Sequence, residues 1–147
     1  MTTEEFIKFL NANQPPAMET LAGEVLEFDT DKASALLKFT AGKSLCNPDD
    51  GIQGGFICGM LDAAMANAVF CRLGEVAIVA TLEIKVSYLE VSRQGELFAR
   101  GTIVRSGKTI TFLEAELRDA DGKLQERQGQ GEDRQGKQAR QPPHREG

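Results

Sequence analysis

Histidine is almost absent from this sequence, and its absence removes several kinds of active site. The 147 residues include one histidine, His144, which lies in a polar stretch at the C-terminal end. Ser-His-Asp and Cys-His sites need an ordered histidine, and a HExxH metal motif needs two. The sequence therefore argues against these reactions. Acid–base chemistry is left to carboxylates, Lys, Tyr or backbone dipoles.

Cysteine is also scarce, and its pattern excludes a zinc site. The three cysteines, Cys46, Cys58 and Cys71, form no CxxC pair, and they lie too far apart in sequence for the usual ligand spacing. We therefore expect no metal and no cofactor. An odd number of unpaired cysteines is typical of reduced thiols in a cytoplasmic protein, in which a buried structural role is favoured over a nucleophilic one.

Long apolar runs and clustered positive charge are missing as well. The N-terminus MTTEEFIKFLNANQ carries early acids and no apolar core, so it does not resemble a signal peptide. We expect no membrane-spanning segment, because no apolar run approaches about 18 residues. The net charge is −5 with Lys and Arg dispersed, which argues against a nucleic-acid partner.

The pattern of apolar residues predicts one α+β domain over residues 1–124. A short helix is expected within residues 1–14, followed by a β-hairpin formed by Thr20–Phe28 and Lys32–Phe39. The segment Gly55–Leu73 is apolar nearly all round, which predicts a buried helix that ends at Gly74.

Three strands are expected after this helix, and then the chain changes character. Val76–Leu89, Glu96–Arg105 and Thr109–Arg118 have strand-like patterns with turn residues between them. Residues 125–147 contain one apolar residue, Ala139, so they are predicted to form a disordered polar tail. A single buried helix with an antiparallel sheet curved around it is the expected architecture.

One segment resembles the active-site region of a known family. The stretch NPDDGIQGGFICGMLDAAMA, from Asn47 to Ala66, resembles the hotdog-fold thioesterases of the PaaI type. Their pattern is an Asn, five residues, His-Gly-Gly, and then an acid. Here Gln53 stands in the His position, and Asp62 falls where the acid falls. The later segments TLEIKVSYL and 95–124 are similar to the family's following strands, so the resemblance covers residues 17–124.

The resemblance implies a homodimeric acyl-CoA thioesterase, with further pairing into a homotetramer left open. Asp62 is implied as the catalytic carboxylate, either as general base or as nucleophile. Asn47 and Thr81 are implied as substrate-contacting or water-positioning residues, and an aryl or medium-chain acyl group is expected. Gln53 keeps a hydrogen-bond donor and acceptor but cannot titrate.

The chemistry of the two glycines follows from their position at the start of a helix. Backbone N–H groups there are unpaired and lie at the positive end of the helix dipole. Glycine also lets a substrate approach the backbone closely. The amides of Gly54 and Gly55 are therefore the predicted oxyanion hole for a thioester carbonyl.

The spacing of these groups predicts a shared site. Gly54 and Asp62 are eight residues apart, which is about 12 Å along a helix. Groups that act on one carbonyl must lie within roughly 3 Å of the reacting atoms. Two antiparallel helices from two protomers can meet this condition, with Asn47, Gln53 and Gly54 from one chain and Asp62 and Thr81 from the other.

Structural alternatives accompany each assignment. Asp62 could instead be a structural carboxylate paired with Lys85, although the glycine spacing favours catalysis. Thr81 suits a strand and Asn47 suits a turn, so neither needs a functional role. At the level of function, a non-catalytic acyl-CoA-binding protein is the alternative. A hotdog dehydratase ranks lower because it generally relies on a histidine.

The C-terminal segment departs from the family. A final apolar strand is expected after the turn Asp121-Gly122-Lys123-Leu124, but a polar sequence follows it. Either the last strand is lost or the reading frame changes near residue 125.

Overall fold

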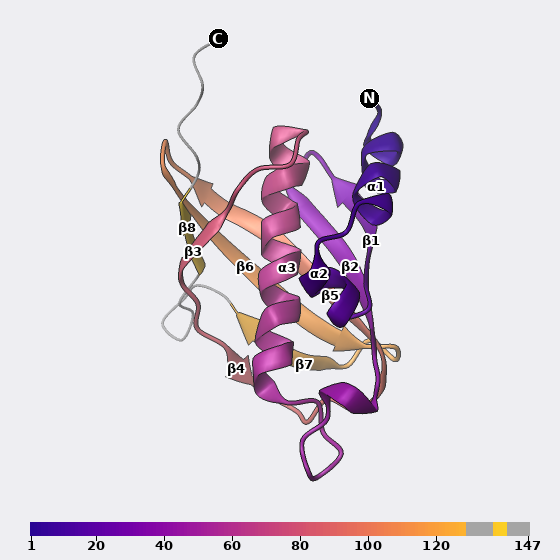
Figure 1. Ribbon diagram of the computed structural model, residues 1–147. Helices are drawn as coiled ribbons and strands as arrows, with labels where there is room; N and C mark the ends of the chain where they lie inside the picture. The colour runs from indigo at the N-terminus through magenta and orange to yellow at the C-terminus, as the bar shows by residue number, and fades with distance from the viewer. Residues whose placement is uncertain (129–136, 141–147) are drawn as a thin grey trace.

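A long helix, α3, crosses one face of an antiparallel sheet in the computed structural model (Figure 1). The structure describes residues 1–128 and 137–140, and side chains as far as residue 124. The helical elements are α1 (Thr3–Ala12), α2 (Pro16–Thr20), the 3₁₀ turn η1 (Lys43–Leu45) and α3 (Gly54–Leu73). The strands are β1 (Gly23–Asp29), β2 (Ser34–Ala41), β3 (Ala80–Glu83), β4 (Ser87–Tyr88), β5 (Gly95–Ser106), β6 (Ile110–Asp119), β7 (Leu124–Gln128) and β8 (Lys137–Arg140).

The N-terminal helix α1 has a well-defined beginning and is fastened to the first strand. Thr2 caps it, and Glu5 bonds back to the Thr2 backbone to complete a capping box. At its other end, the Asn11 amide exchanges two hydrogen bonds of 2.9 Å with the backbone of Val25 in β1. The predicted helix within residues 1–14 is therefore confirmed, and a side-chain amide joins it to the sheet.

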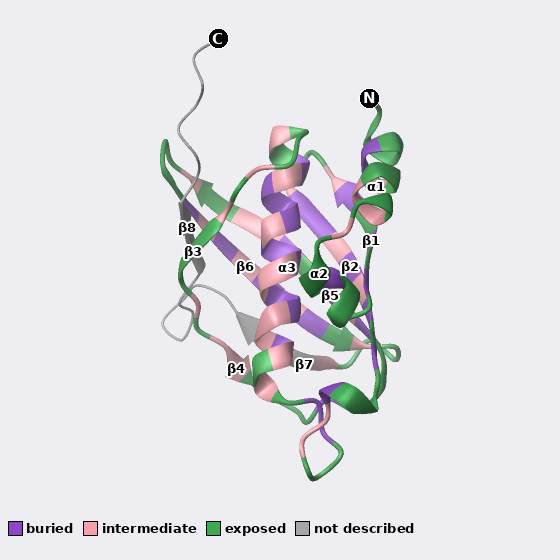
Figure 2. Ribbon diagram, viewed as in Figure 1, coloured by how far each residue is buried: buried purple, intermediate pink, exposed green. Residues whose placement is uncertain are grey.

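The central helix α3 is the core of the molecule, as the sequence predicts. Nine of its residues are buried, and Figure 2 shows buried and intermediate positions alternating along it. Gly74 ends the helix in the left-handed conformation, with φ of 70°. By length and composition α3 would pass as a membrane-spanning helix, but half of its apolar window is buried inside this fold.

The helix and the sheet come into direct backbone contact at Gly101, in the middle of β5. A methyl group on Gly101 would lie 2.5 Å from the carbonyl carbon of Ala64 and 2.7 Å from the amide nitrogen of Met65. These are backbone atoms of α3, so no side chain can move aside to make room. The backbones of helix and strand therefore meet directly at this point, and only glycine fits.

The sheet order confirms an α+β arrangement but differs from the prediction in one strand. The order is β1-β2-β5-β6-β7-β4, with β8 joining β6 to β3. Val76–Leu89, predicted as one long strand, forms only β3 and β4, with non-strand residues before and between them. The alternating apolar and polar residues of this segment lie along one edge of the sheet. There, β3 and β4 each pair with a single described strand.

Part of the segment predicted to be disordered forms strands. β7 pairs with Ala115–Arg118 of β6, and β8 pairs with Ile110–Leu113 of the same strand. The two strands thus lie one after the other along the same edge of β6. Whether they correspond to the final strand of the family stays a prediction. Backbone ladder bonds need no apolar side chains, so composition alone was a poor guide here. The rest of the predicted tail, 129–136 and 141–147, lies outside the described residues.

The contact at Gly101 predicts a large effect from a single methyl group. We expect Gly101→Ala to lower the free energy of unfolding by about 1–3 kcal/mol or more, because overpacking strains the backbone. Urea denaturation of the purified protein measures this change. Gly42→Ala is the matched control, since a methyl group there meets nothing within 4 Å. Equal stability of the two variants would contradict the close contact.

Candidate active site

The start of α3 presents two backbone N–H groups outside the helical hydrogen-bond pattern. The first amides to bond within the turn are those of Phe56 and Ile57, which both donate to the Gln53 carbonyl, at 3.0 and 3.3 Å. Among the described residues, the amides of Gly54 and Gly55 have no acceptor, and the first turn contains no acidic residue. Two donors at the positive end of a helix dipole are thus open to an anionic or carbonyl oxygen.

The residue before the glycines, Gln53, holds the chain in place through its backbone only. Its N–H donates to the Leu45 carbonyl at 2.9 Å. Its side chain is exposed and does not cap the helix. The side-chain amide of Gln53 therefore lies at the surface beside Gly54. There it is able to donate a hydrogen bond to a bound molecule, but it does not stabilise the turn that begins α3.

Asn47 organises the loop that leads to the helix. Its side-chain oxygen accepts hydrogen bonds from the amides of Asp49, at 2.9 Å, and Gly51, at 3.1 Å. Its backbone N–H donates to the Gly51 carbonyl at 2.7 Å. The structure therefore gives Asn47 the turn role that its residue type favours. Its assignment as a substrate contact stays a prediction.

Tyr88 also contacts the start of α3, and the sequence did not single it out. Its hydroxyl donates a 2.8 Å hydrogen bond to the carbonyl oxygen of Gly54. A methyl group on Gly54 would lie 3.1 Å from this hydroxyl, so the ring packs against the bare Cα. The only available signal was that Tyr88 is the one tyrosine in the chain.

Asp62 and Thr81, assigned separately from the sequence, lie together. The Thr81 hydroxyl of β3 donates a 2.9 Å hydrogen bond to one carboxylate oxygen of Asp62. Asp62 is half-buried on α3, and it makes no ion pair with Lys85 among the described residues. A strand hydroxyl thus orients the carboxylate, and the structural alternative based on Lys85 has no support.

One chain does not bring the carboxylate to the glycines. α3 is unbroken from Gly54 to Leu73, so Gly54 and Asp62 are separated by about 12 Å of helix. The described chain therefore keeps the predicted site residues in two groups: the two glycine amides with Gln53 near the loop, and Asp62 with Thr81 about two turns further along.

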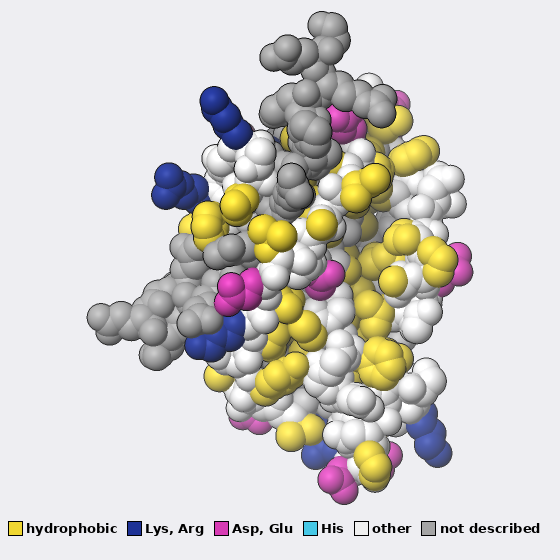
Figure 3. Space-filling model, turned by 60° about the vertical axis from the view of Figure 1, so that its left-hand side comes forward, with side chains coloured by type: hydrophobic (Ala, Val, Ile, Leu, Met, Phe, Trp, Pro, Cys, Tyr) yellow, Lys and Arg dark blue, Asp and Glu magenta, His cyan; other side chains and the backbone are white. Residues whose placement is uncertain are grey.

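The outward face of α3 and the adjoining sheet edge are apolar and partly uncovered. The intermediate or exposed residues on this helix face include small ones, namely Gly55, Gly59, Ala63 and Ala66. All four residues of β3 are exposed, among them Leu82 at 50%, and Ile78, just before the strand, is 86% exposed. Hydrophobic side chains gather on the face that Figure 3 turns toward the viewer. Such a surface is typical of an interaction site.

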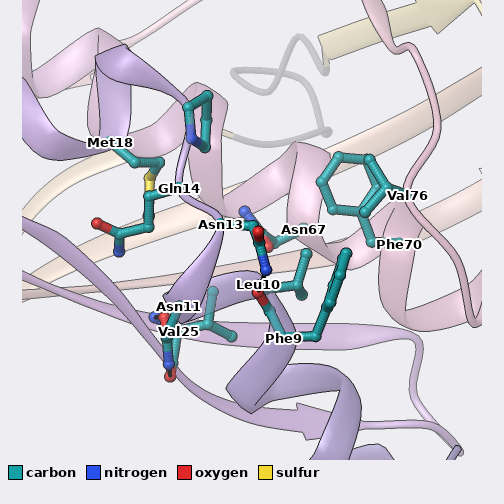
Figure 4. Close-up of a pocket in the computed structure, with 11 residues that line it drawn as sticks. Phe9, Leu10, Asn11, Asn13, Gln14, Met18, Val25, Asn67, Phe70 and Val76 are labelled. Carbon is teal, nitrogen blue, oxygen red and sulfur yellow. Dashed lines mark hydrogen bonds between the residues drawn. The ribbon is translucent and has the colours of Figure 1, made fainter.

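A cavity of about 320 Å³ lies between α1 and the C-terminal half of α3 (Figure 4). Most of its lining is apolar, from Phe9, Leu10, Pro15, Met18, Val25, Phe70 and Val76. Its polar lining includes Asn67, which is 6% exposed and donates to the Ala63 carbonyl of its own helix. The side-chain oxygen of Asn67 has no partner among the described residues. The sequence gave no sign of this cavity, because residues far apart in the chain form it.

No disulfide joins the three cysteines, all of which lie in the described part of the chain. Cys46 and Cys58 are half-buried and Cys71 is buried. Burial raises the pKa of the Cys71 thiol, and the nearby negative charge of Asp29 raises it further. A thiol with a raised pKa is a poor nucleophile at neutral pH, which agrees with the structural role expected for Cys71.

Solved structures share this architecture over nearly the whole chain. A phenylacetic acid degradation-related protein from Ralstonia eutropha JMP134 matches 93% of this chain and 98% of its own, with a TM-score of 0.76 and 27% identity. The E. coli PaaI protein from the phenylacetic acid degradation operon matches 96% of both chains, with a TM-score of 0.77. At 14% identity, this second likeness shows the fold alone.

Sequence comparison agrees with the fold. A candidate esterase from Saccharolobus solfataricus is 26% identical over 101 residues, which cover 69% of this chain and 71% of the relative. The family model for the thioesterase superfamily matches residues 52–126, a segment that includes the start of α3, Asp62 and Thr81. This match spans half of the chain, and the fold is that of the hotdog thioesterases. The chain therefore belongs to the thioesterase superfamily.

Proposed function

We propose that this protein hydrolyses acyl-CoA thioesters at a site shared between two copies of the chain. Asp62 acts there as general base or nucleophile, and the Gly54 and Gly55 amides form the oxyanion hole. The observation that carries the proposal is the pair of open amides at the start of α3 on the same helix as a carboxylate oriented by Thr81. Family membership supports thioester hydrolysis as the reaction.

The chemistry assigned to each half suits a thioester. Attack on the carbonyl places negative charge on its oxygen, and two fixed N–H donors stabilise that charge. The attacking group is either the Asp62 carboxylate or a water molecule that it deprotonates. The C–S bond then breaks and CoA leaves as a thiolate that takes up a proton; where Asp62 attacks, water afterwards hydrolyses the acyl anhydride formed on its carboxylate. Thr81 holds one carboxylate oxygen at 2.9 Å and so fixes the direction in which the carboxylate acts. Neither step needs a histidine.

A second copy of the chain supplies the half that one chain lacks. If two α3 helices pack antiparallel across their exposed faces, the glycines of one lie beside Asp62 of the other. Glycine and alanine on that face allow the two backbones to approach closely. On the side away from β8, β3 has no strand neighbour among residues 1–128 and 137–140, so this edge is available for the same association. An isologous dimer then contains two equivalent sites.

The cavity beside α3 suits the acyl group. Asn67 and Phe70 in its lining come five and eight residues after Asp62, or about 7.5 and 12 Å along the helix. Ala63 and Ala66 have small side chains, so the helix surface between Asp62 and these cavity residues leaves room for a substrate. A volume of about 320 Å³ is at the small end for ligand pockets, which run from roughly 300 to 1,000 Å³. It therefore favours a single aromatic ring or a medium chain, as the description of the Ralstonia relative also suggests.

Replacing the carboxylate tests the assigned chemistry. We expect Asp62→Asn to lower kcat by about 10²- to 10⁴-fold, because the amide cannot accept a proton or attack the carbonyl. Release of CoA from a panel of acyl-CoA thioesters measures this. Glu83→Gln removes an exposed carboxylate from β3 and serves as the control. Equal rates for wild type and Asp62→Asn would rule out the assignment.

Mixing two inactive variants tests the shared site. Asp62→Asn removes the base. Gly54→Pro inactivates the glycine half, because it removes one oxyanion donor and its ring crowds the Tyr88 hydroxyl, while the helix start is kept since Gln53 before it is extended. Unfolding and reassembling a 1:1 mixture makes half of the dimers mixed, and each of these regains one intact site. We expect about a quarter of wild-type activity to return. A mixture as inactive as its components would place both groups in one chain.

Filling the cavity tests its role in acyl selection. Val76 is 55% exposed and lines the cavity, so Val76→Trp adds bulk without disturbing the core. We expect kcat/KM for octanoyl-CoA to fall about 10- to 100-fold, because several methylene groups lose their buried surface. Acetyl-CoA should be unaffected. Glu75→Trp, at the neighbouring exposed position outside the lining, is the control. An equal loss for both substrates would contradict the assignment.

A further inference from the structure

The hydroxyl of Tyr88 contacts the peptide group that carries one of the oxyanion donors. The carbonyl of Gly54 and the N–H of Gly55 belong to the same peptide unit. Tyr88 donates to that carbonyl oxygen at 2.8 Å, and the Gly55 N–H at the other end has no acceptor among the described residues. The phenol, the peptide unit and the open N–H thus form a chain of donors and acceptors that ends where the substrate would bind.

Such a chain changes the strength of the last donor. A hydrogen bond to a peptide oxygen draws electron density from the nitrogen, because the two atoms share a delocalised bond. The N–H then becomes a stronger donor, and neighbouring hydrogen bonds in a chain strengthen one another by about 10–30%. Donation from Tyr88 therefore prepares the Gly55 N–H to hold negative charge.

The surroundings of Tyr88 indicate that its hydrogen bond to Gly54 has a role beyond stabilising the fold. The ring of Tyr88 packs against the bare Cα of Gly54, so the glycine gives the hydroxyl room to reach the carbonyl. Tyr88 is 53% exposed and contributes little to the core. Its strand, β4, follows closely after β3, which carries Thr81. One short sheet edge therefore orients the carboxylate in one half of the site and the peptide unit in the other.

We propose that Tyr88 is a positioning residue that polarises the Gly54–Gly55 peptide and so strengthens the oxyanion hole. This inference rests on the proposed function for its effect on rate, but the polarisation itself can be measured without substrate. Removing one oxyanion donor costs about 10²- to 10³-fold in kcat. A weakening of 10–30% in that donor corresponds to a loss of about two- to eightfold. This is the loss we expect for Tyr88→Phe, with KM nearly unchanged.

A graded test is possible because the chain contains one tyrosine. Growth on 3-fluorotyrosine or 3,5-difluorotyrosine replaces only residue 88 with a phenol of lower pKa, which is a stronger donor while it remains protonated. Measured below that pKa, kcat should rise from Phe to Tyr to fluorotyrosine. Tyr88→Phe protein grown on the same analogues contains no tyrosine and is the control. A flat kcat series together with a lower Tm for Tyr88→Phe would leave only a structural role.

The amide proton of Gly55 gives the second readout, by NMR of the ligand-free protein. We expect its chemical shift to move upfield in Tyr88→Phe and downfield as the phenol becomes more acidic. An unchanged shift across the series would overturn the inference whatever the activity. A shift that follows the series in a protein that hydrolyses no thioester would support the polarisation and reject the proposed function. The two failures are therefore distinguishable.

Discussion

The direct contact between the backbones of α3 and β5 at Gly101 determines how this molecule is organised. With no side chain on Gly101, the strand backbone lies directly against the helix backbone at Ala64 and Met65. One side of α3 is then fully occupied by the sheet, and the small residues on its other side remain near the surface. Every group assigned to the chemistry lies on or against that second side. The close contact thus fixes which face of the helix is available to a substrate or a partner.

Much of this arrangement could be predicted from the sequence, because the signals were local. The unbroken apolar stretch before Gly74 predicted α3, and the acids after Thr2 predicted α1. The spacing from Gly54 to Asp62 is a property of any helix, so their separation was predictable as well. Asp62 and Thr81 were both singled out, and the structure joins them by a hydrogen bond.

The features that escaped prediction depend on contacts between distant segments. Gly101 is one of fifteen glycines, and nothing near it in sequence shows that a helix backbone will lie 2.7 Å from its missing methyl group. The cavity draws its lining from α1, α2, β1, α3 and the loops beside them. The strands β7 and β8 form from a polar sequence because β6 offers backbone partners. In each case the deciding contact comes from a segment that a local pattern does not include.

The placement of Tyr88 also determines what light-based measurements of this protein report. The chain has no tryptophan, and Tyr88 is its one tyrosine. When the protein is excited at wavelengths that its phenylalanines do not absorb, its emission comes from a single ring, which rests on Gly54 at the start of α3. A molecule that binds at these amides must alter the surroundings of that ring. The unmodified protein thus carries an intrinsic fluorophore at the proposed oxyanion hole, and ligand titrations at this position need no added label.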